Sequence, residues 1–414
     1  MTGNAEEGRY SSLMPSLPPP GDPAPADGAL PGTALAEVPH RPLVAYVHVP
    51  FCRTRCGYCD FNTYTPSELA GMSTGDYRSA VVAEMDLAAK VLGDDRPALT
   101  TVFLGGGTPT MLPAEHLVGL LGELRERFGL AADAEVTTEA NPETVDPAYL
   151  ATLREGGFTR ISLGMQSVVP HVLATLERAH TPGRGLEVAR WATEAGFDHV
   201  SLDLIFGAPG ESEADWRRSL DAVTEAPVDH VSAYSLIVEE GTRLALRVRR
   251  GEVPMPDDDE LAAKYLLAEE VLTSAGFSNY ETSNWAREGG RCRHNLAYWR
   301  GANWWGFGPG AHSHIGGVRF WNRRHPRSYA AECLAGRSPA QAREVLTPED
   351  RRIERVMLEL RLADGLPLMV LSGSERERVG DIVAEGLAEI RSERLVLTLR
   401  GRLLADGVVL RLLD

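Results

Sequence analysis

The chain has 414 residues, 43% of them hydrophobic and 24% charged, which suffices for one large core and a smaller second one, because single cores stop growing at roughly 250 to 300 residues. The formal net charge of −16 argues against a general nucleic-acid-binding protein, which needs a basic surface. Five cysteines, three of them crowded into one short segment, argue against a secreted disulfide framework and favour metal binding in a reducing compartment.

The first 42 residues carry proline and glycine clusters, such as Pro18-Pro19-Pro20-Gly21. They contain no apolar stretch of signal-peptide length and therefore predict a disordered tail, with Met14 as an alternative start. No stretch of about 18 apolar residues occurs anywhere in the chain. We expect a cytoplasmic protein with at most peripheral membrane contact.

Short β-rich apolar runs then alternate with segments of helical periodicity. Three of these segments, 75–92, 113–128 and 147–155, have apolar residues three and four positions apart. The predicted strands cover residues 43–49, 100–104, 135–139, 160–165, 199–205 and 230–236. This repeated order of strand and helix predicts an α/β fold built on a parallel sheet or barrel over residues 43–250.

Past residue 250 the pattern changes. Residues 251–340 predict helices followed by an aromatic and glycine-rich region that packs on the barrel. Residues 341–414 predict a small C-terminal domain that starts with a helix over 348–362 and ends in a hairpin of residues 395–398 and 408–410.

Three thiols follow the first predicted strand in a CxxxCxxC loop formed by Cys52, Cys56 and Cys59. Iron–sulfur clusters are held by cysteine thiolates, and three thiolates leave one iron open to a small molecule. The alternative is a zinc site, but structural zinc normally has four ligands.

A glycine run, Gly105-Gly106-Gly107-Thr108, follows the second predicted strand, and polar residues follow the later ones. Glycine lets the backbone approach a ligand closely because no Cβ intervenes. In parallel sheets, ligands bind beyond the carboxyl ends of the strands. The glycine run is either part of such a site or an ordinary turn between strand and helix.

Residues 43–325 resemble the HemN/HemW group of the radical S-adenosylmethionine (SAM) superfamily. The resemblance is carried by the cysteine loop and by His-Val-Pro-Phe-Cys, Gly-Gly-Gly-Thr-Pro-Thr, Glu-Ala-Asn-Pro and Leu-Gly-Met-Gln-Ser. It implies a partial (β/α)6 barrel with a smaller C-terminal α+β or helical domain. It also implies a 4Fe-4S cluster on Cys52, Cys56 and Cys59, with SAM bound to that cluster.

The resemblance carries over to single residues around SAM, which are Tyr46, Gly106, Gly107, Thr108, Glu139, Gln166, Arg178 and Asp203. The chemistry agrees, since Glu139 suits ribose hydroxyls and Arg178 suits a carboxylate through a paired contact. Without the resemblance, the alternative is that Glu139 and Asp203 are helix caps and that Arg178 is an exposed charge.

Two features separate the branches of the group. Coproporphyrinogen oxidases that resemble HemN carry a further cysteine two positions after the third cluster ligand, whereas this chain has Phe61 there. The motif His294-Asn295-Leu296-Ala297-Tyr298-Trp299 resembles the HemW branch of haem chaperones. We therefore expect a chaperone that passes haem to an acceptor protein, with no catalytic residue assigned. The alternative is an oxygen-independent coproporphyrinogen III oxidase of porphyrin biosynthesis.

In the chaperone interpretation, His294 offers an axial imidazole to haem, and Tyr298, Trp299, Trp304 and Trp305 offer a flat apolar surface for the porphyrin. The alternative is that these side chains serve packing. We interpret Cys292 and Cys333 as structural thiols. A flavodoxin or ferredoxin is the expected class of electron donor, and the acidic charge disfavours radical modification of tRNA.

Overall fold

The structure is a computed structural model that describes residues 21–69, 72–178 and 181–413. Six parallel strands lie side by side in chain order at its centre. They are β2 (Leu43–Val49), β3 (Leu99–Gly106), β4 (Leu130–Ala140), β5 (Arg160–Gln166), β6 (His199–Phe206) and β7 (His230–Ser235). All six predicted strands are confirmed, although β4 begins five residues earlier than expected. The predicted α/β barrel is confirmed.

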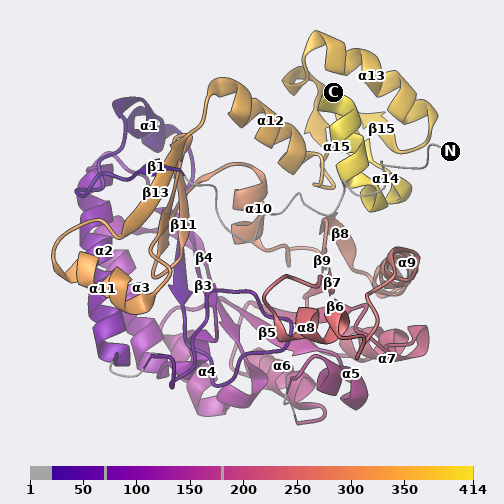
Figure 1. Ribbon diagram of the computed structural model, residues 1–414, viewed down its shortest axis with the longest axis horizontal. Helices are drawn as coiled ribbons and strands as arrows, with labels where there is room; N and C mark the ends of the chain where they lie inside the picture. The colour runs from indigo at the N-terminus through magenta and orange to yellow at the C-terminus, as the bar shows by residue number, and fades with distance from the viewer. Residues whose placement is uncertain (1–20, 70–71, 179–180, 414) are drawn as a thin grey trace.

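Helices connect these strands and cover the outer face of the sheet (Figure 1). They are α2 (Thr74–Leu92), α3 (Ala114–Phe128), α4 (Pro147–Glu155), α5 (Pro170–Thr175), α6 (Arg184–Glu194) and α7 (Glu213–Thr224). Two further helices, α8 (Arg243–Arg249) and α9 (Asp258–Ser274), follow β7. The ends of α2 and α7 are fixed by capping boxes, in which Ser73 and Ser212 accept backbone N–H groups of the first turn.

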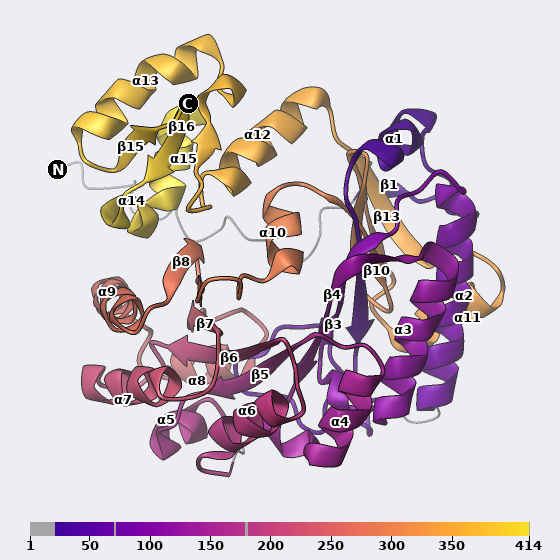
Figure 2. The ribbon, with the colours of Figure 1, turned by 180° about the vertical axis from the view of Figure 1, so that it is seen from behind.

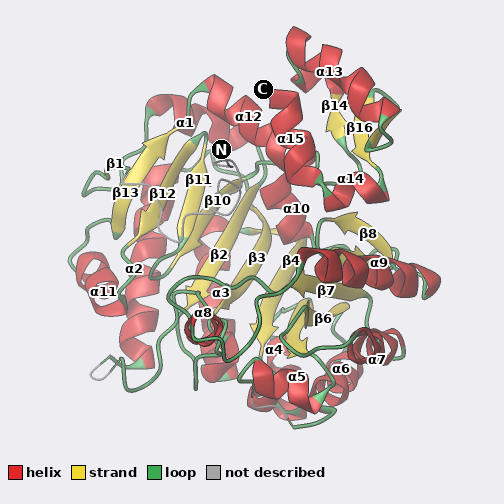
Figure 3. Cartoon of the chain, turned by 45° about the vertical axis from the view of Figure 1, so that its right-hand side comes forward, coloured by secondary structure: helices red, strands yellow, loops and turns green. Residues whose placement is uncertain are grey.

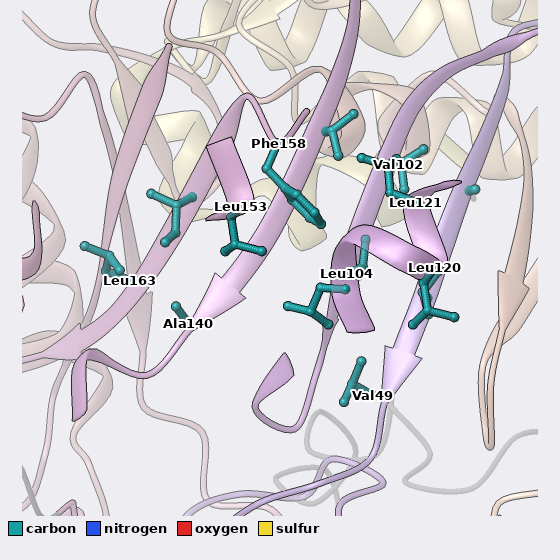
Figure 4. Packing of buried hydrophobic residues seen from close by; sticks show 14 of the residues in the cluster. Val49, Val102, Leu104, Leu120, Leu121, Ala140, Leu153, Phe158 and Leu163 are labelled. Atoms are coloured by element: carbon teal, nitrogen blue, oxygen red, sulfur yellow. The ribbon is translucent and has the colours of Figure 1, made fainter. Parts of the chain in front are cut away.

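The core lies between the sheet and these helices. Val102 and Leu104 on β3 belong to one buried cluster with Leu120 and Leu121 on α3 (Figure 4). Each of these side chains is fully buried, which stabilises the fold by about 1.5 to 3 kcal/mol per residue. The apolar residues that alternate along β3 therefore pack against apolar residues that recur at helical spacing on α3.

The aromatic and glycine-rich region extends the central sheet instead of packing on it as a separate layer. β10 pairs in parallel with β2, and antiparallel strands follow it (Figure 3). The strands on this side are β10 (Asn303–Phe307), β11 (His312–Ile315), β12 (Val318–Asn322) and β13 (Ala340–Val345). The other edge ends with β9 (Asn284–Ala286) and β8 (Ser278–Glu281), and α11 (Pro326–Leu334) packs on α2.

Residues 21–42, expected to belong to a disordered tail, are folded. They form β1 (Asp22–Pro23), which pairs with β13, and α1 (Gly32–Glu37). Ala34 and Val38 are buried in the main core, and the Glu37 carboxylate binds both terminal nitrogens of Arg351 at 2.6 and 2.7 Å. The proline cluster at 18–20 and Met14 lie outside the described residues.

The C-terminal unit has a hydrophobic core of its own. Its elements are α12 (Pro348–Glu359), β14 (Leu366–Pro367), α13 (Gly373–Ala384), β15 (Ala388–Arg391), β16 (Arg394–Leu397), α14 (Leu399–Leu403) and α15 (Ala405–Leu413). The predicted terminal hairpin is wrong, because residues 408–410 lie in α15 and β16 pairs with β14 and β15. Val408, Val409 and Leu412 are buried at helical spacing.

The two ends of the parallel strands face different surroundings (Figures 1 and 2). The C-terminal unit lies beyond their amino ends, with α10 (Arg293–Trp299) between it and the sheet, where α10 contacts both α12 and β3. The carboxyl ends point away from that unit. Throughout 21–69, 72–178 and 181–413, no helix has the length and hydropathy needed to cross a membrane.

Candidate functional site

A cavity of about 720 Å³ opens at the carboxyl ends of the parallel strands. It brings together the three loop thiols and most of the residues that the sequence predicted around SAM. Those lining it are Cys52, Cys56, Cys59, Gly106, Gly107, Thr108, Glu139, Gln166, Arg178 and Asp203. Residues from six different segments of the chain therefore meet in one pocket, which we call the strand-end pocket.

The cysteine loop crosses this pocket and is held at several points along its backbone. The Cys52 N–H donates to the Tyr64 carbonyl at 3.0 Å, and the Gly57 N–H donates to the Leu176 carbonyl at 3.3 Å. The Leu244 N–H at the start of α8 donates to the Gly57 carbonyl at 2.8 Å. The end of α5 and the start of α8 therefore hold the loop, together with Tyr64 farther along the same segment.

The three thiols are free and half-buried, and their surroundings fit an iron–sulfur cluster. Burial raises the pKa of Cys52, and it raises that of Cys59 to about 11, so these thiols need a strongly positive ligand to lose their protons. An Arg178 Nη1–H donates to Cys56 Sγ at 3.1 Å, a contact that favours a thiolate.

No group of three His, Cys, Asp or Glu side chains converges on a single metal ion within the described part of the chain. In a 4Fe-4S cluster each thiolate binds a different iron, so the three thiols need not converge.

The glycine run anchors the cysteine loop to the end of β3. The Gly107 N–H donates to the Val49 carbonyl at 2.8 Å, and the Thr108 N–H donates to the Phe51 carbonyl at 2.7 Å. A Cβ at Gly107 would lie 2.7 Å from the Phe51 oxygen, and Gly106 has a φ of 109°. These positions need glycine because the two backbones touch and because positive φ is costly for other residues.

Two carboxylates lie inside the barrel near this run. Glu139 on β4 accepts the Gly106 N–H at 2.9 Å, and burial together with Asp203 raises its pKa to about 8. Asp203 on β6 accepts hydrogen bonds from Ser162 at 2.8 and 2.9 Å, and burial raises its pKa as well. Neither residue caps a helix, so the interpretation of Glu139 and Asp203 as helix caps is wrong.

Gln166 and Arg178 complete the wall of the pocket. Gln166 is buried and has a φ of 68°, a conformation that costs energy for a residue with a side chain and that clusters at functional sites. Arg178 also donates to the Gly164 carbonyl at 3.1 Å and is not an exposed charge. Tyr46 lies behind the lining, where its hydroxyl contacts His48 Nδ1 at 3.0 Å and its ring packs near Phe103.

His294 does not lie with this group at the carboxyl ends. It is 1% exposed on α10, and its ring stacks on Phe103. Both ring nitrogens have partners, since Nδ1 is 2.6 Å from Thr101 Oγ1 and Nε2 is 2.9 Å from the Tyr298 hydroxyl. Burial lowers the pKa of His294 to about 3, so the ring is neutral. Both ring nitrogens are thus hydrogen-bonded, as the packing alternative expects, and the role of His294 as a haem ligand stays a prediction.

The aromatic residues expected to form a porphyrin surface do not all lie on one side of the sheet. Tyr298 packs against Trp304 with ring centres 5.0 Å apart. Trp305 points to the opposite side of β10, as consecutive strand residues do, and its Nε1–H approaches Glu84 at 3.5 Å in the core. Tyr298 and Trp305 therefore cannot face one ligand, and the packing alternative is favoured for them.

Sequence reasoning missed a set of polar side chains that face into the barrel. Ser162, Ser201 and Ser232 alternate with buried apolar residues on three neighbouring strands and line the strand-end pocket. The sequence signal that could have found them was the alternation of these serines with apolar residues along β5, β6 and β7. They place hydroxyl groups around Asp203.

A second missed feature is the buried pair of Glu135 on β4 and Arg160 on β5, 3.1 Å apart. Arg160 also donates to the Gly290 carbonyl at 2.7 Å, and the Cys292 thiol donates to Glu135 at 3.6 Å. Cys292 and Cys333 are both buried, and burial raises the pKa of each, in line with structural thiols.

Comparison with known proteins agrees with this arrangement. The model of the radical SAM superfamily matches residues 46–223. The chain is 56% identical over 385 residues to the heme chaperone HemW of Mycobacterium tuberculosis, covering 93% of this chain and 97% of that protein. It is 32% identical to the heme chaperone HemW of Escherichia coli strain K12, covering 89% and 97% of the two chains.

A solved structure shares the fold. It is described as "Coproporphyrinogen III oxidase (HemN) from Escherichia coli is a Radical SAM enzyme", and it superposes with a TM-score of 0.75 over 92% of each chain. The sequence identity is 22%, so this similarity supports a shared fold and no shared activity.

Proposed function

This chain belongs to the HemW family of the radical SAM superfamily, and from that membership we propose that it binds haem and transfers it to an acceptor protein. The observation that carries the proposal is the likeness, over almost the whole chain, to proteins named as haem chaperones. A chaperone is a carrier, so the chain needs a haem site and a release step instead of a turnover cycle.

We propose that Cys52, Cys56 and Cys59 hold a 4Fe-4S cluster, which when bound supplies one-electron chemistry. Support comes from three free thiols around one pocket and from the Arg178 contact to Cys56. The backbone of the glycine run keeps the loop in place. A flavodoxin or ferredoxin is the class of donor that we propose for the electron.

We further propose that SAM lies in the strand-end pocket. Arg178 would bind its carboxylate through charge-assisted hydrogen bonds. Glu139 and Asp203 are buried carboxylates with raised pKa, so each gains from a hydroxyl or ammonium donor. Gly106, Gly107, Thr108 and Gln166 would shape the wall, and Tyr46 would act through the packing behind it.

The oxidase alternative is not favoured, because Phe61 occupies the position of the further cysteine. We propose a cytoplasmic location, because the proposed cluster suits a reducing compartment.

The test is a haem titration of anaerobically reconstituted protein, followed by Soret absorbance. The same preparation is incubated with SAM, reductant and coproporphyrinogen III. We expect tight haem binding and no protoporphyrinogen. Sustained formation of protoporphyrinogen without tight haem binding would overturn the chaperone function and establish the oxidase.

A further inference from the structure

We propose that haem docks at the mouth of the strand-end pocket, on an apolar rim formed by Phe61, Tyr234 and Ile237, and not on α10. This inference rests on the proposed haem-binding function and assigns its site. The rim lies beside the cysteine loop, so the docked haem would lie over the proposed cluster and SAM site.

The first observation is the exposure of three large apolar side chains around one pocket. Phe61 is 62% exposed, Ile237 60% and Tyr234 43%, and all three line the strand-end pocket. Apolar surface gathered around a concave site is typical of ligand binding. A porphyrin face is flat and apolar, and it would remove this surface from water.

The backbone explains why these side chains point to the pocket. His230, Ser232 and Tyr234 alternate along β7 and all line the pocket, so Tyr234 is the outermost member of that row. Ile237 follows on the loop between β7 and α8. Phe61 comes two residues after Cys59, in a loop that is bonded to α8 through Gly57 and Leu244. The contacts that hold the cysteine loop therefore hold Phe61 as well, and strand β7 holds Tyr234.

The second observation is charge. Arg53 is exposed at the start of the cysteine loop and lines the pocket, and among the described residues it has no carboxylate within ion-pair distance. Arg55, on the same loop, is already paired with Glu68 at 3.2 Å. Asp60 and Glu239 also line the pocket and would repel an anion. Arg53 is thus the position for a haem propionate, through a charge-assisted contact.

The third observation concerns the competing site. His294 is buried and both of its ring nitrogens are hydrogen-bonded, so haem ligation there would require a ring nitrogen to lose its partner, Thr101 or Tyr298. The Glu135 carboxylate, which accepts the backbone N–H groups of Arg293 and His294 at 3.1 and 3.0 Å, holds that end of α10 in place. The rim needs no such rearrangement.

The experiment measures haem affinity by Soret titration of the reconstituted full-length protein, with cluster absorbance and SAM affinity recorded in the same samples. The variants are Ile237→Glu and Phe61→Glu. The matched control is Met369→Glu, an apolar side chain that is 81% exposed in the C-terminal unit. We expect at least tenfold weaker haem binding for Ile237→Glu, with unchanged cluster absorbance, and no change for Met369→Glu.

Arg53→Gln tests the propionate contact with a chemical probe. Wild-type protein should prefer haem over haem dimethyl ester, which lacks the propionate charges, and Arg53→Gln should lose that preference. Wild-type affinity in Ile237→Glu, with loss of binding only in His294→Ala, would overturn the rim and place haem on α10. Failure of the wild-type protein to bind haem would instead overturn the proposed function itself.

Discussion

The carboxylate of Glu135 on β4 accepts the backbone N–H of His294 at 3.0 Å, which joins two residues 159 positions apart in the chain. The same carboxylate pairs with Arg160 and accepts the N–H of Arg293. α10 has no side-chain cap from its own N-cap residue, Cys292, so Glu135 takes that role from the barrel. Glu135 therefore holds the His294–Trp299 motif at the amino end of the barrel.

Glu135→Ala should destabilise the protein strongly. The substitution leaves the Arg160 guanidinium buried without its carboxylate, a loss of about 3 to 5 kcal/mol in the free energy of unfolding. Chemical denaturation measures this loss, and Glu126→Ala on the exposed side of α3 is the matched control. A change below 1 kcal/mol would show that Arg160 finds another partner.

His294→Ala should lower stability and leave haem affinity unchanged. The ring makes two hydrogen bonds and stacks on Phe103, so its removal should cost about 2 to 4 kcal/mol. Thermal unfolding and Soret titration are measured on the same protein, with the exposed His40→Ala as control. Lost haem binding at unchanged stability would contradict the structural role and revive His294 as a ligand.

Glu84→Gln should remove a pH dependence of stability. Glu84 on α2 is buried and accepts hydrogen bonds from Tyr329 at 2.5 Å, Asn322 at 2.7 Å and the Gly308 N–H at 2.9 Å. Burial raises its pKa from 4.5 to about 7. The unfolded chain therefore loses this proton near pH 4.5, whereas the folded protein keeps it until about pH 7.

Since the folded state binds more protons in this window, the contribution of Glu84 to stability falls as pH rises from 4.5 to 7. The shift corresponds to about 3 kcal/mol. Denaturation at several pH values should show wild type losing stability relative to Glu84→Gln across this window. A constant difference between the two proteins would mean that Glu84 is ionised throughout.

Cys56→Ser should prevent retention of the proposed cluster, because the three thiols are the ligands available in the loop. We expect loss of the broad visible absorbance and of bound iron and sulfide after anaerobic reconstitution. Cys333→Ala, at a buried thiol on α11, should keep the visible absorbance, the bound iron and the sulfide. Full iron and sulfide content in Cys56→Ser would falsify the assignment.

The sequence determined the six parallel strands and the position of the pocket. Short β-rich apolar runs such as residues 43–49 predict strands locally, and parallel strands of known order bring their carboxyl ends to one edge. Motif spacing then identified Cys52, Cys56, Cys59 and the glycine run. Of the eight residues expected around SAM, all but Tyr46 line that pocket.

Only the tertiary structure decided the environment of His294 and of the aromatic residues after it. A motif states which side chains are near in sequence, but burial depends on distant partners such as Thr101 and Glu135, which no local pattern reveals. The helix over residues 405–413 was missed for the same reason, because a short apolar run fits a strand or a helix until its packing is known. The rim of Phe61 and Ile237 likewise needed the fold, since residues 176 positions apart meet only when the barrel closes.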